Sequence, residues 1–202
     1  MSEPVHTLSS EEIMDYLERA MVYGWYHNLE RSGFPPWADA YVTLKEIDDF
    51  TDHYKRFGNE EPFIEFLSRL SNIDRDTFKQ MWSMLSEKQR AEIIDKATYN
   101  ITLIGVRKLL EWITKKLSEE KYKEARAKVL QDAKDYLSGR IYGTMLMNRI
   151  AFVFWPSVKD IKESGYEYDN FFRGKGLLGY ICTTDFMIYV RRYLVEVLEK
   201  QK

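Results

Sequence analysis

Residues 86–117 read SEKQRAEIIDKATYNITLIGVRKLLEWITKKL, and this stretch decides the fold class. An apolar stripe recurs through Ile93, Ala97 and Ile101, and a second stripe, offset from the first, continues to Leu117. Spacings of three and four residues place side chains on one face of an α-helix. The stretch therefore predicts one long helix that ends at Leu117.

Capping patterns predict where this helix and its neighbours begin. A Ser or Thr followed three residues later by Glu or Gln satisfies two free backbone donors at a helix start. Three such pairs are present: Ser9 with Glu12, Thr43 with Glu46, and Ser86 with Gln89. We also expect Asp74 or Asp76 to cap a helix, and Gly58 and Gly139 to end helices.

The remaining sequence favours the same architecture. No segment sustains the alternation of a strand, and 10 Gly and 5 Pro are few for a sandwich or barrel with many tight turns. We therefore predict an all-α protein, a single globular bundle of roughly eight to ten helices in one domain over 1–202. Two of these helices are expected at 140–155 and 158–163. Aromatic residues make up 15% of the chain, which predicts an aromatic-rich core.

The net charge of −2 conceals an uneven distribution. Residues 1–101 carry 11 basic and 19 acidic side chains, a net charge of −8, whereas residues 102–202 carry 19 and 13, a net charge of +6. Three interpretations follow: halves that attract each other within one fold, a head-to-tail oligomer, or a basic surface for a polyanion.

A glycine-rich segment in the second half is a candidate anion site. Residues 174–179 read GKGLLG and match G-x-G-x-x-G, and Arg173 precedes them. Backbone amides of Gly174 and Gly176 would approach a phosphate, and Arg173 and Lys175 would add positive charge. The preceding YEYDNFF is no apolar strand, so a connecting loop is the plainer interpretation.

The basic segment 107–149 is a second candidate anion site. It holds 11 Lys and Arg against 6 Asp and Glu. Arg107 and Lys108 have only Glu111 close by in sequence, so they are candidates for phosphate contact. Other members, such as Glu124 and Lys128, are spaced for intrahelical ion pairs, which indicates a salt-bridged solvent face.

Asp49, Asp52 and His53 are weak candidates for catalysis. Asp49 and His53 are four residues apart and share a helix face, and a carboxylate beside an imidazole suits acid–base chemistry. A solvated helix face is the alternative. No convincing catalytic motif is present, and the three scattered histidines predict no metal site and no cofactor.

An aromatic group in the first half supplies the candidates for contact with a partner. Trp25, Tyr26, His27 and Trp37 flank a Pro-Pro turn, and such side chains anchor many protein interfaces. Packing into the core is the alternative for the same residues.

The sequence thus predicts a helical interaction or scaffold protein that self-associates as a homodimer. A nucleic-acid-metabolism protein binding phosphates through its basic second half is one alternative. A small-molecule enzyme with an Asp/His pair is another. The only cysteine, Cys182, permits no internal disulfide, and no apolar segment resembles a signal peptide or membrane span. We therefore expect a cytoplasmic protein without membrane contact.

Overall fold

A computed structural model describes residues 8–32, 36–140 and 187–201 of the chain. These residues form seven α-helices and one short 3-10 helix, and no strand occurs among them. The all-α prediction is confirmed. The number of helices is lower than the expected eight to ten, and the two helices expected at 140–155 and 158–163 lie almost wholly outside the described residues.

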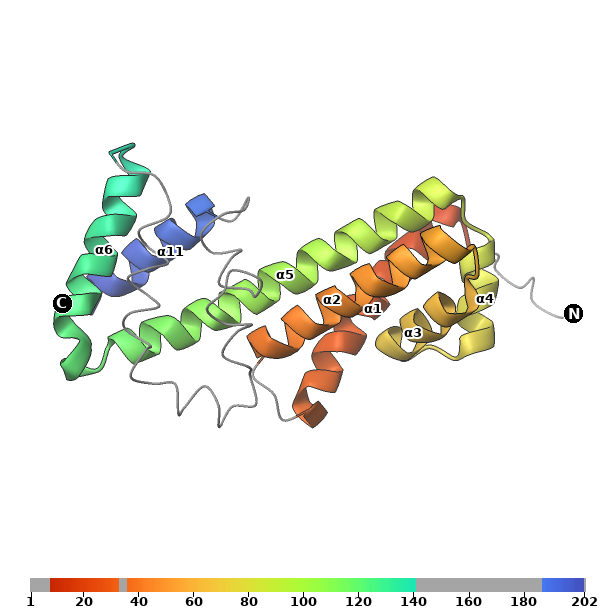
Figure 1. The fold of residues 1–202 in the computed structure, drawn as a ribbon, viewed down its shortest axis with the longest axis horizontal. Coiled ribbons are helices and arrows are strands. Elements are labelled where there is room, and N and C mark those ends of the chain that lie inside the picture. Colours follow the sequence, from red (N-terminus) through yellow and green to blue (C-terminus); the bar gives the residue numbers. More distant parts are fainter. Residues whose placement is uncertain (1–7, 33–35, 141–186, 202) are drawn as a thin grey trace, which may run out of the picture. The chain divides into compact units, whose positions relative to one another are not determined.

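The chain divides into two compact units, and α2 and α5 contribute residues to both. Figure 1 shows the helices coloured along the chain. In chain order the elements are α1 (Ser10–Ser32), α2 (Pro36–Phe57), α3 (Glu61–Ser71), α4 (Arg75–Ser83), α5 (Glu87–Leu117), η1 (Glu120–Tyr122), α6 (Lys123–Leu137) and α11 (Met187–Glu199). Unit 1 comprises Met1–Gly33 and Val42–Thr102, and unit 2 comprises Phe34–Tyr41 and Leu103–Lys202. That the chain is a single domain stays a prediction.

Two of the predicted capping boxes are formed. The backbone N–H of Glu12 donates to Ser9 Oγ at 3.2 Å, and the backbone N–H of Gln89 donates to Ser86 Oγ at 3.2 Å. These contacts satisfy donors that have no partner within the first turns of α1 and α5. The Asp74 side chain caps α4 in the same way, accepting from the Thr77 N–H at 3.2 Å.

The third capping prediction is wrong. Thr43 lies inside α2, which begins at Pro36, and its side chain is buried. Proline suits the first turn of a helix because its missing N–H would have no partner there. The Thr43-x-x-Glu46 pattern therefore lies inside a helix that has already begun. Thr43 packs in the core there and does not cap a helix.

Residues with positive φ end three of the helices. Gly58 follows α2 with φ 68°, and Gly139 follows α6 with φ 77°, as predicted. Asn72 does the same after α3 with φ 54°, and its N–H bonds back to the carbonyl of Arg69. The left-handed conformation stops each helix and lets the chain turn.

Stacked aromatic rings fill the core of unit 1, which confirms the aromatic-rich core. Phe50 of α2 stacks on Phe66 of α3 at 4.7 Å, and Phe78 stacks on Trp82 within α4 at 5.6 Å. The Trp82 indole N–H donates to Glu60, which also accepts from Arg90 of α5 at 2.7 Å. The ring contacts join α2 to α3, and these polar contacts link α4 and α5 to the start of α3.

Helix α1 meets α3 at a glycine. A Cβ on Gly24 would lie 2.2 Å from the carbonyl oxygen of Leu70 and 2.9 Å from Ser71 Cα. No side chain fits there, so the glycine permits the close approach of the two backbones. This contact fixes the surface residues of α1 relative to the end of α3.

Unit 2 has its own core contacts. Helix α11 packs on α6, and the fully buried Arg191 lies with its guanidinium 4.5 Å from the ring centroid of Tyr136. The ring of Trp37 packs against that of Trp112, with the ring centroids 5.0 Å apart and the planes tilted by 35°. Burial raises the pKa of Tyr193 above its ordinary value, and the nearby Glu111 adds to this effect.

Candidate functional site

The acidic and histidine candidates of α2 lie in solvent. Asp49, Asp52 and His53 are all exposed. The Asp52 carboxylate pairs with Arg56 at 3.0 Å, and the His53 ring lies 4.8 Å from the ring of Phe57. The geometry is that of a solvated helix face, and none of the three residues lines the hollows described below.

The basic candidates of α5 share one carboxylate. Arg107 lies 3.8 Å from Glu111, and Lys108 lies 3.3 Å from it. Ion pairs with neighbouring acids also occupy several cations of η1 and α6, for example Lys128 with Glu124 at 3.0 Å. Arg173, Gly174, Lys175 and Gly176 lie outside the described residues. Most cations in the described part of the basic half thus have an acidic partner in the same half, although Arg107 with Lys108, and Lys116 with Lys121, share one carboxylate each.

The structure separates the four aromatic partner candidates into two pairs. Trp25 is 2% exposed and Trp37 is 9% exposed, so both are core residues and present no surface to a partner. Burial removes these large apolar rings from water, which is favourable, and each ring packs on another ring. Tyr26 and His27 are exposed.

Tyr26 and His27 belong to a larger surface, here called the tyrosine face, which comprises Tyr16, Tyr23, Tyr26 and His27 of α1. Tyr16 is 51% exposed, Tyr23 69% and Tyr26 42%. Beside the rings lies a hollow of about 430 Å³, where Gly24 brings α1 against the end of α3. Its lining residues are Ala20, Tyr23, Gly24, Tyr26, His27, Ser71 and Asn72.

A second surface of α1 borders α5 within unit 1. This surface, here called the charged groove, has a volume of about 450 Å³. Its lining residues are Glu11, Met14, Asp15, Glu18, Lys88, Gln89, Glu92, Ile93 and Lys96. Met14 is half-buried and Ile93 is buried, so the groove exposes little apolar surface, and charged side chains form the edges. Asn100 of α5 donates to Glu18 of α1 at 2.7 Å, which joins the two helices at this level.

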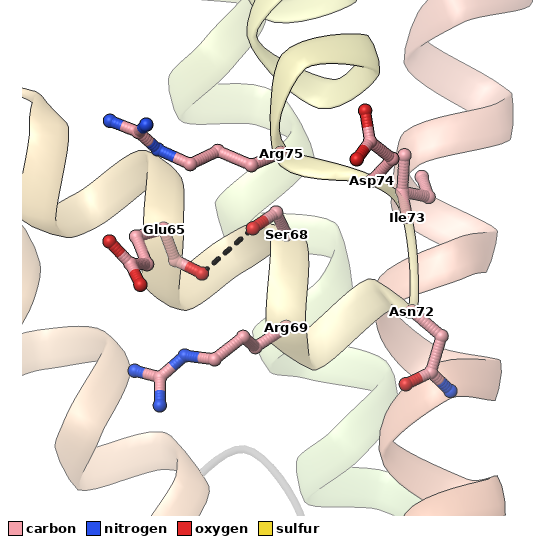
Figure 2. Close-up of a pocket in the computed structure, with 7 residues that line it drawn as sticks. All are labelled: Glu65, Ser68, Arg69, Asn72, Ile73, Asp74 and Arg75. Atoms are coloured by element: carbon pink, nitrogen blue, oxygen red, sulfur yellow. Dashed lines mark hydrogen bonds between the residues drawn. The ribbon is translucent and has the colours of Figure 1, made fainter.

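A third hollow, of about 540 Å³, lies at the α3–α4 corner (Figure 2). Arg69 and Arg75 extend toward the same side, and the Glu65 carboxylate lies between their levels. Arg75 is held by an ion pair with Glu61, which also binds Lys79. The Lys79 ammonium and the Arg75 guanidinium lower the pKa of Glu61 below its ordinary value of 4.5. Acidic and basic groups balance here, so the corner selects neither anions nor cations.

Sequence reasoning missed the charged groove. The acidic residues Glu11, Asp15 and Glu18 recur at spacings of four and three, which places them on one flank of α1. Lys88 and Lys96, eight residues apart, likewise share a flank of α5. The spacing was visible in the sequence, but which helix borders which was not.

Two general features bear on the chemistry available. No three His, Cys, Asp or Glu side chains gather into a possible metal site in residues 8–32, 36–140 and 187–201. None of the described helices combines the length and the apolar character that crossing a membrane requires.

Comparisons with known proteins leave the function to be argued from the structure. No family model matches the chain, and no curated protein or solved structure is significantly similar to it.

Proposed function

We propose that this chain is a cytoplasmic helical interaction or scaffold protein that self-associates as a dimer through helix α1. The surface of α1 carries this proposal. Three of its tyrosines are exposed by 42% to 69%, and the same helix lines both the hollow of the tyrosine face and the charged groove. Exposed aromatic rings on a rigid element supply large contact area at low entropic cost, which suits a further binding partner, and the groove on the other flank of α1 supports contact with a second copy.

The close packing beneath α1 supports this role. Gly24 holds the helix against Leu70 and Ser71, and Ile13, Leu17 and Met21 are almost completely buried. A surface held in place by its core loses little conformational freedom when a partner binds. A second copy of the chain is the simplest partner, because closed two-fold dimers are the commonest oligomers.

Binding of nucleic-acid phosphates has less support from the geometry. Arg107 and Lys108 are both drawn to Glu111, and Lys123, Lys128 and Lys134 of α6 each have an acidic partner on η1, α6 or α11. A titration with DNA and with RNA at two salt concentrations tests this alternative. Phosphate contacts would produce binding that weakens steeply as salt rises, because counterions are released.

An enzyme built on the Asp/His pair also has less support. Asp49 and His53 are exposed on α2, and neither lines one of the three hollows. Replacing His53 with alanine tests this alternative: a change in the affinity of any detected ligand would revive it.

The proposal is tested by sedimentation velocity of the full chain across a concentration series. We expect the average sedimentation coefficient to rise with concentration from the value of one chain to that of two, as mass action requires. A single species with the mass of one chain at every concentration would contradict self-association.

A further inference from the structure

The two edges of the charged groove carry opposite patterns of charge. The α1 edge is acidic throughout, with Glu11, Asp15 and Glu18. The α5 edge carries Lys88 and Lys96, with Glu92 between them. Both edges belong to unit 1, so their proximity is internal to one compact body.

Most charged side chains of the groove have no ion-pair partner among the residues that the structure describes. Lys88, Lys96, Glu11 and Glu92 make no ion pair within 4.0 Å with any residue that the structure describes. Glu11 only accepts a 3.4 Å hydrogen bond from the Ser10 hydroxyl. Asp15, by contrast, pairs with Arg19 at 3.2 Å. Opposite charges therefore border the same groove without meeting across it.

The direction of the two helices fixes how a second copy can fit. Glu11 lines the groove with Lys88 near the start of both helices, and Glu18 is bonded to Asn100 further along both. Helices α1 and α5 therefore run in the same direction along the groove. A two-fold axis parallel to them would place the α1 edge of each copy against the α5 edge of the other. A two-fold axis across them would instead oppose α1 to α1, with acidic side chains facing each other.

We propose that the charged groove is the contact between two copies of this chain, with the acidic α1 edge of each copy lying against the lysine edge of the other. The inference rests on the proposed self-association and assigns it to one surface. The half-buried Met14 provides a small apolar contact, and the charged rim sets partner and register. The tyrosine face lies on the other flank of α1 and stays open in this dimer.

The test compares charge-reversal variants in the full chain. Variant K88E/K96E makes both edges acidic, and variant E11K/D15K makes the α1 edge basic while leaving the Glu18–Asn100 bond intact. Each places like charges opposite each other, and we expect the dimer dissociation constant to rise by about tenfold or more. An equimolar mixture of the two variants restores opposite charges at both α1–α5 contacts, and dimer should reappear as a heterodimer.

Matched controls separate this effect from a change in total charge. Variant K45E/K55E changes the net charge as much as K88E/K96E does, at exposed positions of α2 outside the groove. Variant Y23A/Y26A removes two rings of the tyrosine face. We expect both to dimerise as the wild type does. Circular dichroism and thermal unfolding check that every variant folds, and K88Q/K96Q replaces the lysine variant if it does not.

The outcomes are distinct. A wild type that stays monomeric contradicts the proposed function itself. A wild-type dimer that both charge-reversal variants leave unchanged, or that only Y23A/Y26A dissociates, overturns the groove assignment while self-association stands. Loss of dimer in both variants with recovery on mixing supports the assignment, and dissociation that increases with salt agrees with it.

Discussion

The charged groove of unit 1 and the basic segment of unit 2 differ in whether their charged side chains form ion pairs. In the segment 107–140, cations pair with acids close by, as Lys128 does with Glu124 at 3.0 Å and Lys121 with Glu119 at 3.4 Å. In the groove, Lys88 and Lys96 border acidic residues and pair with none of those described. Net charge over a stretch of sequence therefore says little about which charges can bind a partner. The ion pairs formed in the folded structure determine which charges remain available.

The first prediction compares a glycine of each unit and concerns the largest effect. Gly24→Ala puts a Cβ 2.2 Å from the Leu70 carbonyl, so the backbones of α1 and α3 must separate. We expect a loss of about 3 kcal/mol of unfolding free energy. Gly139→Ala meets nothing within 4 Å and only strains φ at 77°, which costs about 1 kcal/mol. Denaturant unfolding measures both, and equal losses would refute the close approach of α1 and α3.

The second prediction compares an ion pair of each unit. Glu60→Ala leaves the Trp82 indole N–H and the Arg90 guanidinium without their shared acceptor in a partly buried site, and should cost about 2 kcal/mol. Glu124→Ala removes only an exposed pair with Lys128 and should change stability by about 0.5 kcal/mol or less. Thermal melts measure both substitutions. A comparable cost for the two would contradict the expectation that the partly buried pair contributes more to stability than the exposed one.

The third prediction concerns the exposed face of α2. His53→Ala removes an exposed ring that lies 4.8 Å from the ring of Phe57, so stability should change by about 0.5 kcal/mol or less. The same variant should dimerise as the wild type does, because the residue is outside the groove. Sedimentation and a thermal melt check both expectations, and a large effect on either would give this face a role that the geometry does not indicate.

The smallest expected effect is a pH dependence at the α3–α4 corner. Lys79 first, and then Arg75, hold the pKa of Glu61 below 4.5. A lowered folded-state pKa contributes stability that is present above the ordinary value and is lost as pH falls through the lowered one. Carboxyl NMR titration should give a Glu61 midpoint below 4.5 that rises in Lys79→Met. An unchanged midpoint in that variant would remove Lys79 as the cause.

Local features of the fold could be predicted from sequence because their physical cause is local. Ser9 with Glu12 and Ser86 with Gln89 satisfy backbone donors within one turn, and Gly58 needs only its own φ. The prediction of a helix cap at Thr43 was wrong because it relied on local spacing alone. The spacing to Glu46 fits a capping box, but the helix had already begun at Pro36, and only the core position of Thr43 shows this.

The candidate site could be predicted only in part, because it depends on which helices are neighbours. The sequence predicts partner contact for Trp25, Tyr26 and His27 together. In the structure Trp25 is buried in the core, whereas Tyr26 and His27 are exposed. The flank of Glu11 and Asp15 was readable from spacing, but its position beside Lys88 required the packing of α1 on α5. Sequence periodicity gives the faces of each helix, and tertiary contacts decide which faces remain exposed.

The most direct test of the account is sedimentation velocity on an equimolar mixture of K88E/K96E and E11K/D15K. The account predicts that each variant alone sediments as one chain at a concentration where the wild type is a dimer, and that the mixture returns to the dimer value. A mixture that remains monomeric while the wild type dimerises, with both variants folded, would contradict the claim that the charged groove joins the two copies.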